Sequence, residues 1–154
     1  MSKVRNVMRR GDGGTRTQSA TRAALGLLGK VRRQLTPVGA WGKGELYYDD
    51  YHIPGTYQPE WHKAGSRCII GSIGHALGFE DNVYPSGVIP EGSAGRGAVA
   101  LRLLAETING EQAGSLLANA ESVLYVYNDE VGTTQDLILD LIDRTIEYAE
   151  RSLT

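Results

Sequence analysis

The sequence predicts a mainly α-helical protein, a compact bundle of about five helices with one irregular or short β-hairpin segment rich in aromatic residues. Five segments carry apolar residues three and four positions apart, the spacing that places them on one face of a helix. Glycine or proline follows most of these segments, where a helix would end. A chain of 154 residues is long enough for one domain with a hydrophobic core.

The chain is expected to begin with a flexible basic arm over residues 1–18. This part contains a Gly-Asp-Gly-Gly run and has no apolar periodicity. From Ser19, which can cap a helix, apolar residues follow helical spacing as far as Leu35, and Pro37 stops the run. A single helical domain is therefore expected over residues 19–154.

Residues 38–64 hold most of the large aromatic side chains, among glycines and prolines that exclude a long helix. A short strand or hairpin over Glu45–Ile53 fits this stretch. Tyrosine and tryptophan suit a surface that is half apolar and half wet, so the segment is a candidate binding surface. The alternative is an irregular cap whose rings cover the helical core, which is the commoner role of such rings. The candidate binding rings are Trp41, Tyr47, Tyr48, Tyr51 and Trp61.

Three further helices are expected in the middle of the chain. The first covers residues 66–79, with Ser66 as its cap. A stretch rich in glycine and proline at 80–97 predicts a mobile surface loop. Helices over 98–109 and 112–127 follow, and the apolar face of the second consists of Leu116, Leu117, Ala120, Val123, Leu124 and Tyr127.

The last helix shows the clearest pattern in the sequence. Thr133 is expected to cap it, with Asp136 reaching back in an arrangement like a capping box. In the turn before it, Asn128 and Asp129 are expected to hydrogen-bond backbone groups. The apolar face of this helix consists of Leu137, Ile138, Leu141, Ile142, Ile146 and Ala149.

Charge is distributed unevenly along the chain. Residues 1–33 carry a net charge of +8, although the whole chain has a net charge of −2. The basic arm can neutralise the phosphates of a nucleic acid, or it can lie on the acidic body of the protein. No aromatic residue stands between the basic ones to stack on bases. The candidate contacts of the arm are Arg9, Arg10 and Arg16.

The composition favours a cytoplasmic protein that does not span a membrane. No stretch approaches the roughly 20 apolar residues that a transmembrane helix needs. Residues 1–10 lack the apolar core of a secretory signal. The single cysteine, Cys68, cannot form an internal disulfide, which fits a reducing compartment.

A few residues invite a catalytic interpretation. Cys68 could act as a nucleophile with His75 as its base and Asp129 as the orienting group, but a cysteine on an apolar helix is more often a packed core residue. The gaps between the potential metal ligands match no compact ligand spacing, so neither a metal nor another cofactor is expected. These potential ligands are His52, His62, Cys68 and His75.

The order of the short motifs resembles a known family. An Ala-rich first helix is followed by Trp41-Gly42-Lys43-Gly44, by Cys-Ile-Ile-Gly-Ser-Ile from Cys68 to Ile73, and by Tyr127-Asn128-Asp129 with Thr133. Over residues 20–150 this series resembles a small domain family of unknown function, typical of actinobacteria and their phages, with Trp-x-x-Gly, Cys-x-x-Gly-Ala and Trp-Asn-Asp patterns. The chain departs from these patterns at Ser72, at Tyr127 and in the long segment 80–97.

The resemblance implies a phage or bacterial protein of the cytoplasm and brings no known activity. The leading hypothesis is a non-enzymatic accessory protein that binds a host or phage protein through the aromatic segment, the basic arm or both. One alternative is a small hydrolase that uses Cys68, a histidine and Asp129. The other is a protein that binds nucleic acid without sequence specificity through its basic arm.

Overall fold

The computed structural model describes residues 17–48, 64–79 and 95–154. Over these ranges the protein is mainly helical, which confirms the predicted fold class. The helices are α2 (Gln18–Leu35), α3 (Ile69–Ala76), α4 (Arg96–Asn109), the 3-10 helix η1 (Glu111–Gly114), α5 (Leu117–Asp129) and α6 (Gln135–Arg151).

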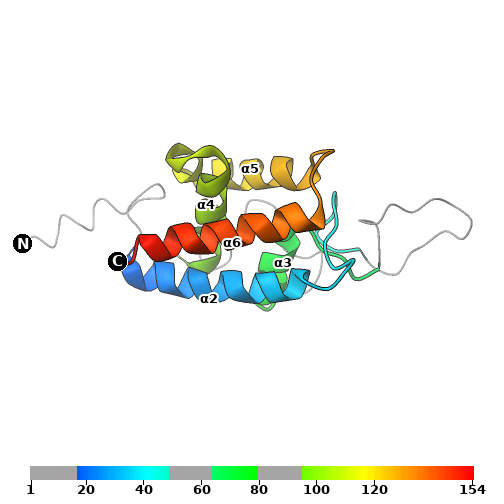
Figure 1. The fold of residues 1–154 in the computed structure, drawn as a ribbon, viewed down its shortest axis with the longest axis horizontal. Coiled ribbons are helices and arrows are strands. Elements are labelled where there is room, and N and C mark those ends of the chain that lie inside the picture. The colour runs from blue at the N-terminus through cyan, green and yellow to red at the C-terminus, as the bar shows by residue number, and fades with distance from the viewer. Residues whose placement is uncertain (1–16, 49–63, 80–94) are drawn as a thin grey trace, which may run out of the picture.

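Helix α4 is the centre of the bundle. All its residues from Gly97 to Glu106 are buried, because α2, α5, α6 and η1 all pack against it. Figure 1 shows α2 and α6 running alongside each other, with α5 on the other side of α6. The buried carboxylate of Glu106 accepts a hydrogen bond of 2.8 Å from the hydroxyl of Tyr148 on α6.

Helix α2 begins earlier than predicted. Its cap is Thr17, whose hydroxyl accepts the amide of Ala20 at 3.0 Å, so Gln18 is already helical and does not belong to a flexible arm. Residues 1–16 of the predicted arm lie outside the described residues. The apolar face of α2 is buried in the core, as its spacing predicts; it consists of Ala24, Leu27, Leu28, Val31 and Leu35.

Helix α3 is shorter than the predicted 66–79 and has a different cap. The thiol of Cys68, and not the hydroxyl of Ser66, accepts the amide of Gly71 at the start of the helix, at 3.3 Å. Ser66 instead belongs to an extended stretch, where its carbonyl accepts the amide of Tyr48 at 2.9 Å. The helix ends at Ala76.

The predicted helix over 112–127 is divided in two. Gly110, with φ of 91°, ends α4, and η1 and α5 follow as separate elements. A glycine is needed there because the left-handed backbone is strained for other residues.

The predicted loop over 80–97 ends two residues early, because Gly95 caps α4 and the helix begins at Arg96. Residues 80–94 of this loop lie outside the described residues.

Helix α6 is capped by Thr134, whose hydroxyl accepts the amide of Leu137 at 3.3 Å, and not by Thr133 as predicted. Thr133 uses its hydroxyl to donate to the carbonyl of Tyr127. Leu137 is 43% exposed and is thus the one member of the predicted apolar face that points outward. The other members are buried or half-buried against α2 and α4.

Side-chain contacts fasten the start of α6 to the end of α2. The amide group of Gln135 donates to the carbonyls of Leu35 and Pro37 at 2.8 and 2.7 Å. The carbonyl of Leu35 lies in the last turn of α2, where it has no partner within the helix, whereas the carbonyl of Pro37 also accepts the amide of Ala40 at 3.0 Å. The helices are joined again by Arg32 and Asp143, whose two parallel hydrogen bonds measure 2.9 and 3.1 Å.

The described part of the aromatic segment, residues 41–48, is irregular. It is held by two isolated bridges to Arg67, from Trp41 and from Tyr47, and not by a hairpin of its own; residues 49–53 of the predicted hairpin lie outside the described residues. None of the helices in the described ranges could cross a membrane, since none is both long enough and apolar enough.

Candidate functional site

Asn128 lies near the end of α5 and is only 1% exposed. Its side chain connects the short motifs that the sequence shares with the family it resembles. Its carbonyl oxygen accepts hydrogen bonds from the indole nitrogen of Trp41 at 2.7 Å and from the amide of Ile69 at 3.1 Å. Its amide nitrogen donates to the carbonyl of Gly42 at 3.0 Å and to the carboxylate of Asp129 at 2.9 Å. Both donors and both acceptor sites of Asn128 are therefore used. They join three separate parts of the chain.

Neighbouring residues extend this network. The carboxylate of Asp129 accepts the amide of Gly44 at 3.0 Å, as expected of an acidic residue in a turn that binds backbone groups. The ammonium group of Lys43 donates to the carbonyls of Glu130 and Val131. The turn between α5 and α6 is thus fixed to residues 41–44 by both side chains and backbone.

The candidate binding rings do not share one environment. Trp41 and Tyr48 are buried, at 4% and 6% exposure, and the Tyr48 hydroxyl donates to the carbonyl of Lys43. Tyr47 is half-buried, with the guanidinium group of Arg67 4.7 Å from the centre of its ring. The two buried rings do not offer the exposed surface that the binding hypothesis needs, because they cover the core. Tyr51 and Trp61 lie outside the described residues.

The close approach of residues 41–48 to α3 depends on Gly71. A Cβ atom built on Gly71 would lie 1.9 Å from the carbonyl oxygen of Leu46, so only glycine fits. The Cys-x-x-Gly motif therefore has a physical explanation. Its cysteine caps α3, and its glycine lets the aromatic segment pass over the first turn of that helix.

Cys68 lines a small cavity of about 300 Å³ together with Gly44, Glu45, Leu46, Tyr125 and Asp129. Burial raises the pKa of the Cys68 thiol to about 11, against the opposing effect of hydrogen bonds from the amides of Gly71 and Ile70. A smaller upward contribution comes from the negative charge of Asp129. The thiol is therefore protonated at neutral pH, and a protonated thiol is a poor nucleophile.

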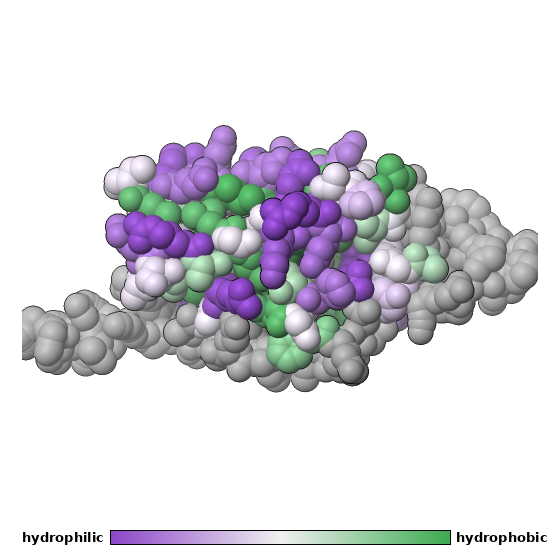
Figure 2. Space-filling model, turned by 90° about the horizontal axis from the view of Figure 1, so that it is seen from below, coloured by the Kyte–Doolittle hydropathy of each residue, from purple (hydrophilic) through white to green (hydrophobic). Residues whose placement is uncertain are grey.

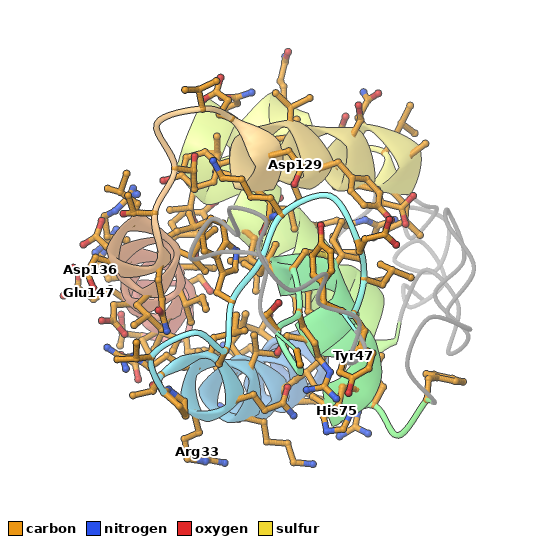
Figure 3. All side chains as sticks on the ribbon, turned by 90° about the vertical axis from the view of Figure 1, so that its right-hand side faces the viewer. Arg33, Tyr47, His75, Asp129, Asp136 and Glu147 are labelled. Atoms are coloured by element: carbon orange, nitrogen blue, oxygen red, sulfur yellow. The ribbon has the colours of Figure 1, made fainter. Side chains whose placement is uncertain are left out.

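The structure does not bring His75 together with Cys68 and Asp129. Cys68 and Asp129 share the small cavity, but His75 is exposed in the last turn of α3, seven residues or about 10 Å along the helix from Cys68. Figure 3 shows His75 and Asp129 at opposite sides of the molecule. Among the described residues no three potential ligands lie close enough together to hold a metal ion. His52 and His62 lie outside them, as do Arg9, Arg10 and Arg16 of the basic arm.

A larger cavity of about 600 Å³, here named the α4–α5 groove, lies between the end of α4, η1 and the outer face of α5. Its apolar lining includes Val126, which is 60% exposed. Among the described residues that line it, Glu130 carries the only charged group. These residues are Ile108, Asn109, Gln112, Ala113, Asn119, Ser122, Val123, Val126, Tyr127 and Glu130.

The hydrogen bonds around Asn128 and Asp129 hold one end of this groove in place. Tyr127 and Glu130 line it, and their carbonyls accept hydrogen bonds from Thr133 and Lys43. Asn128, between them, is anchored in the core. The residues that carry the family resemblance thus have a structural role, because they fix the position of residues that line this end of the groove.

Sequence reasoning missed the groove. The predicted helix over 112–127 was expected to bury Leu116 and Val123 on one face, but Leu116 is 52% exposed and Val123 lines the groove. One signal was present in the sequence: Val126 is apolar and lies off the predicted face. A helix with apolar residues on more than one side has a second surface to cover.

The fold and these contacts define a small helical protein in which a buried asparagine ties an aromatic segment to two helices. The chain belongs to a family of unknown function (DUF6197), whose model matches residues 10–148. Comparisons with curated proteins and with solved structures give no match.

Proposed function

We propose that the protein is a non-enzymatic interaction module whose α4–α5 groove binds a polypeptide segment of a partner protein. We further infer that it is an accessory protein of a phage or bacterial cytoplasm, with a host or phage protein as partner; the resemblance of its motifs to a family of actinobacteria and their phages supports this inference.

The observation that carries the proposal is an open groove with an exposed apolar wall. Val123 and Val126 lie on the outer face of α5, and Ile108 and Ala113 face them from the end of α4 and from η1. A volume of about 600 Å³ falls within the range of small binding sites, roughly 300–1,000 Å³. Apolar surface left exposed in this way favours binding of an apolar group.

The lining also favours a partner of particular charge. Glu130 is acidic, and the amides of Asn109 and Gln112 provide hydrogen-bonding groups. No basic side chain is among the described residues that line the groove. Glu111 begins η1 beside them. A segment with one or two large apolar side chains beside a lysine or arginine would match both the apolar wall and the carboxylates.

The chemistry of Cys68 supports a binding role over a hydrolase. A hydrolase of the predicted type needs a thiolate and a base in contact with it. Here burial raises the pKa of the thiol to about 11, and His75 lies at the far end of α3. The motif residues are also engaged in packing and in hydrogen bonds to the backbone.

The test is selection of short random displayed peptides on the full chain, followed by titration of the selected peptides against variants. We expect the selected peptides to combine a large apolar residue with lysine or arginine. Val126→Glu should weaken their binding at least tenfold, or about 1.4 kcal/mol, by placing a charge on the apolar wall. Glu130→Gln should weaken the basic peptides less at high salt than at low salt.

The control is Val38→Glu, which alters a valine that is more exposed than Val126, at 91% against 60%, and does not line the groove. Binding should be unchanged in this variant, and both variants should keep the wild-type melting temperature, because neither valine is buried. Selected peptides that bind Val126→Glu as tightly as the wild type would show that the groove is not the binding site.

A further inference from the structure

The outward side of α2 carries three cations that form no ion pair within the described part of the chain. Arg22, Lys30 and Arg33 are exposed, and no described residue forms an ion pair with any of them. Neither α2 nor α3 contains an aspartate or a glutamate. We name these three cations the α2 basic face.

The helix geometry brings these cations to one side of the molecule. Arg22 and Arg33 are eleven residues apart, which is close to three full turns and about 16 Å along the axis. Lys30 precedes Arg33 by three residues and is therefore its neighbour on the helix surface. Figure 3 shows Arg33 directed away from the body. Figure 2 shows the face that contains α2, where hydrophilic side chains are present with hydrophobic ones between them.

The acidic helix α6 does not neutralise this face. Its Asp143 pairs with Arg32 at 2.9 Å, on the side of α2 that is turned toward α6. The carboxylates of Asp136 and Glu147, also on α6, lie on a different side of the molecule from Arg33 in Figure 3. No described carboxylate therefore neutralises the α2 basic face, which is available to an external anion as far as the described residues are concerned.

We propose that the α2 basic face binds the phosphate backbone of a nucleic acid without sequence specificity. A duplex presents one negative charge per roughly 1.7 Å of its axis, so each of three cations spread over about 16 Å can meet a phosphate. The segment that precedes α2 contains Lys3, Arg5, Arg9, Arg10 and Arg16, which add positive charge to the same end of the sequence.

A nucleic acid fits this face better than an anionic membrane surface. A helix that lies on a membrane inserts large apolar side chains into the lipid. The large apolar residues of α2 are turned into the core, and the outward positions Ala23 and Gly26 between the cations are small. The face therefore offers charge without anything to insert. It also lies on the other side of the bundle from α5, so it is separate from the α4–α5 groove.

The test is fluorescence anisotropy of a labelled DNA duplex with the full chain across a salt series. The wild type should bind with an affinity that falls steeply with salt. In Arg22→Gln/Lys30→Gln/Arg33→Gln, the slope of log affinity against log salt should decrease by about 2–3, because each lost phosphate contact removes roughly 0.9. All three side chains are exposed, so the melting temperature should be preserved.

A charge-matched pair of double variants provides the control. Lys30→Gln/Arg33→Gln should lower the slope by about 1.5–2, whereas Arg144→Gln/Arg151→Gln on α6 removes the same charge and should leave it nearly unchanged. Equal losses in the two double variants would mean that net charge alone acts, and would overturn the proposal. So would a triple variant with wild-type slope, which would assign binding to residues 1–16, or a wild type that binds vesicles of anionic phospholipid but no duplex.

Discussion

Replacing Asn128 with alanine should destabilise the protein strongly. The substitution leaves three buried groups without their partner: the indole N–H of Trp41, the amide of Ile69 and the carbonyl of Gly42. A buried polar group left unsatisfied costs roughly 1–3 kcal/mol. The three costs are not additive, because the groups share one partner and can relax together, so we expect a loss of about 3–5 kcal/mol in the free energy of unfolding.

The assay is urea denaturation followed by far-ultraviolet circular dichroism. Asn119→Ala is the control, because Asn119 lies exposed on the same helix and its loss should change stability by less than about 0.5 kcal/mol. A second test is the double variant Trp41→Phe/Asn128→Ala. Once the indole donor is gone, removing Asn128 should cost about 1 kcal/mol less than it does in the wild type.

The result that would refute this reasoning is a loss below about 1 kcal/mol for Asn128→Ala. It would mean that water or rearranged backbone replaces the side chain, and that the network does not hold the aromatic segment to α3 and α5. Additive effects of Trp41→Phe and Asn128→Ala would show that the bond between the two side chains does not contribute to stability.

The remaining predictions concern local contacts. Gly71→Ala should destabilise the protein by at least about 3 kcal/mol, since its Cβ would lie 1.9 Å from a backbone oxygen. Gly26 has open space around it, so Gly26→Ala should instead stabilise α2 by roughly 0.5–1 kcal/mol. Thermal and urea denaturation would measure both changes. The Cys68 thiol should react with a thiol reagent at pH 8 about 100-fold more slowly in the native protein than in urea, because its pKa is raised from 9.0 to about 11; equal rates would contradict this burial. The same shift makes stability fall between pH 9 and 11, where the unfolded thiol releases its proton and the folded one keeps it, and Cys68→Ala should lack this part of the decline. Asp143→Asn should lower the free energy of unfolding by at most about 1 kcal/mol, because the pair with Arg32 is solvent-exposed. This difference between variant and wild type should be present above pH 3.8 and disappear as the pH falls through the lowered pKa of Asp143. A difference that persists at acidic pH would show that it does not come from the ion pair.

Much of the fold could be predicted from the sequence because its signals are local. The apolar spacing that forms α2 and α6 repeats within three or four residues, and the stops at Pro37 and Gly110 act on adjacent backbone. The caps were less predictable. Thr133 and Thr134 are both capping residues, and which one caps α6 depends on the carbonyl of Tyr127, to which Thr133 donates.

The candidate sites were less accessible to sequence reasoning, since they depend on which distant segments meet. Cys68 and Asp129 were both candidates, but their shared cavity and the position of His75 outside it follow from the packing of α3 against α5. The α4–α5 groove depends on the break at Gly110 and on how α5 then lies on α4. No pattern within one segment contains that information.

By itself, the sequence determined the helical class, the approximate positions of five helices, the uneven charge and the tendency of Asn128 and Asp129 to bind backbone groups. Only the tertiary structure decided that Trp41 is a buried partner of Asn128, and that Arg32 pairs with Asp143 while Arg33 forms no ion pair with any described residue. The physical reason is distance along the chain. Helical periodicity and capping act over three or four residues, whereas these pairings join residues 87 and 111 positions apart.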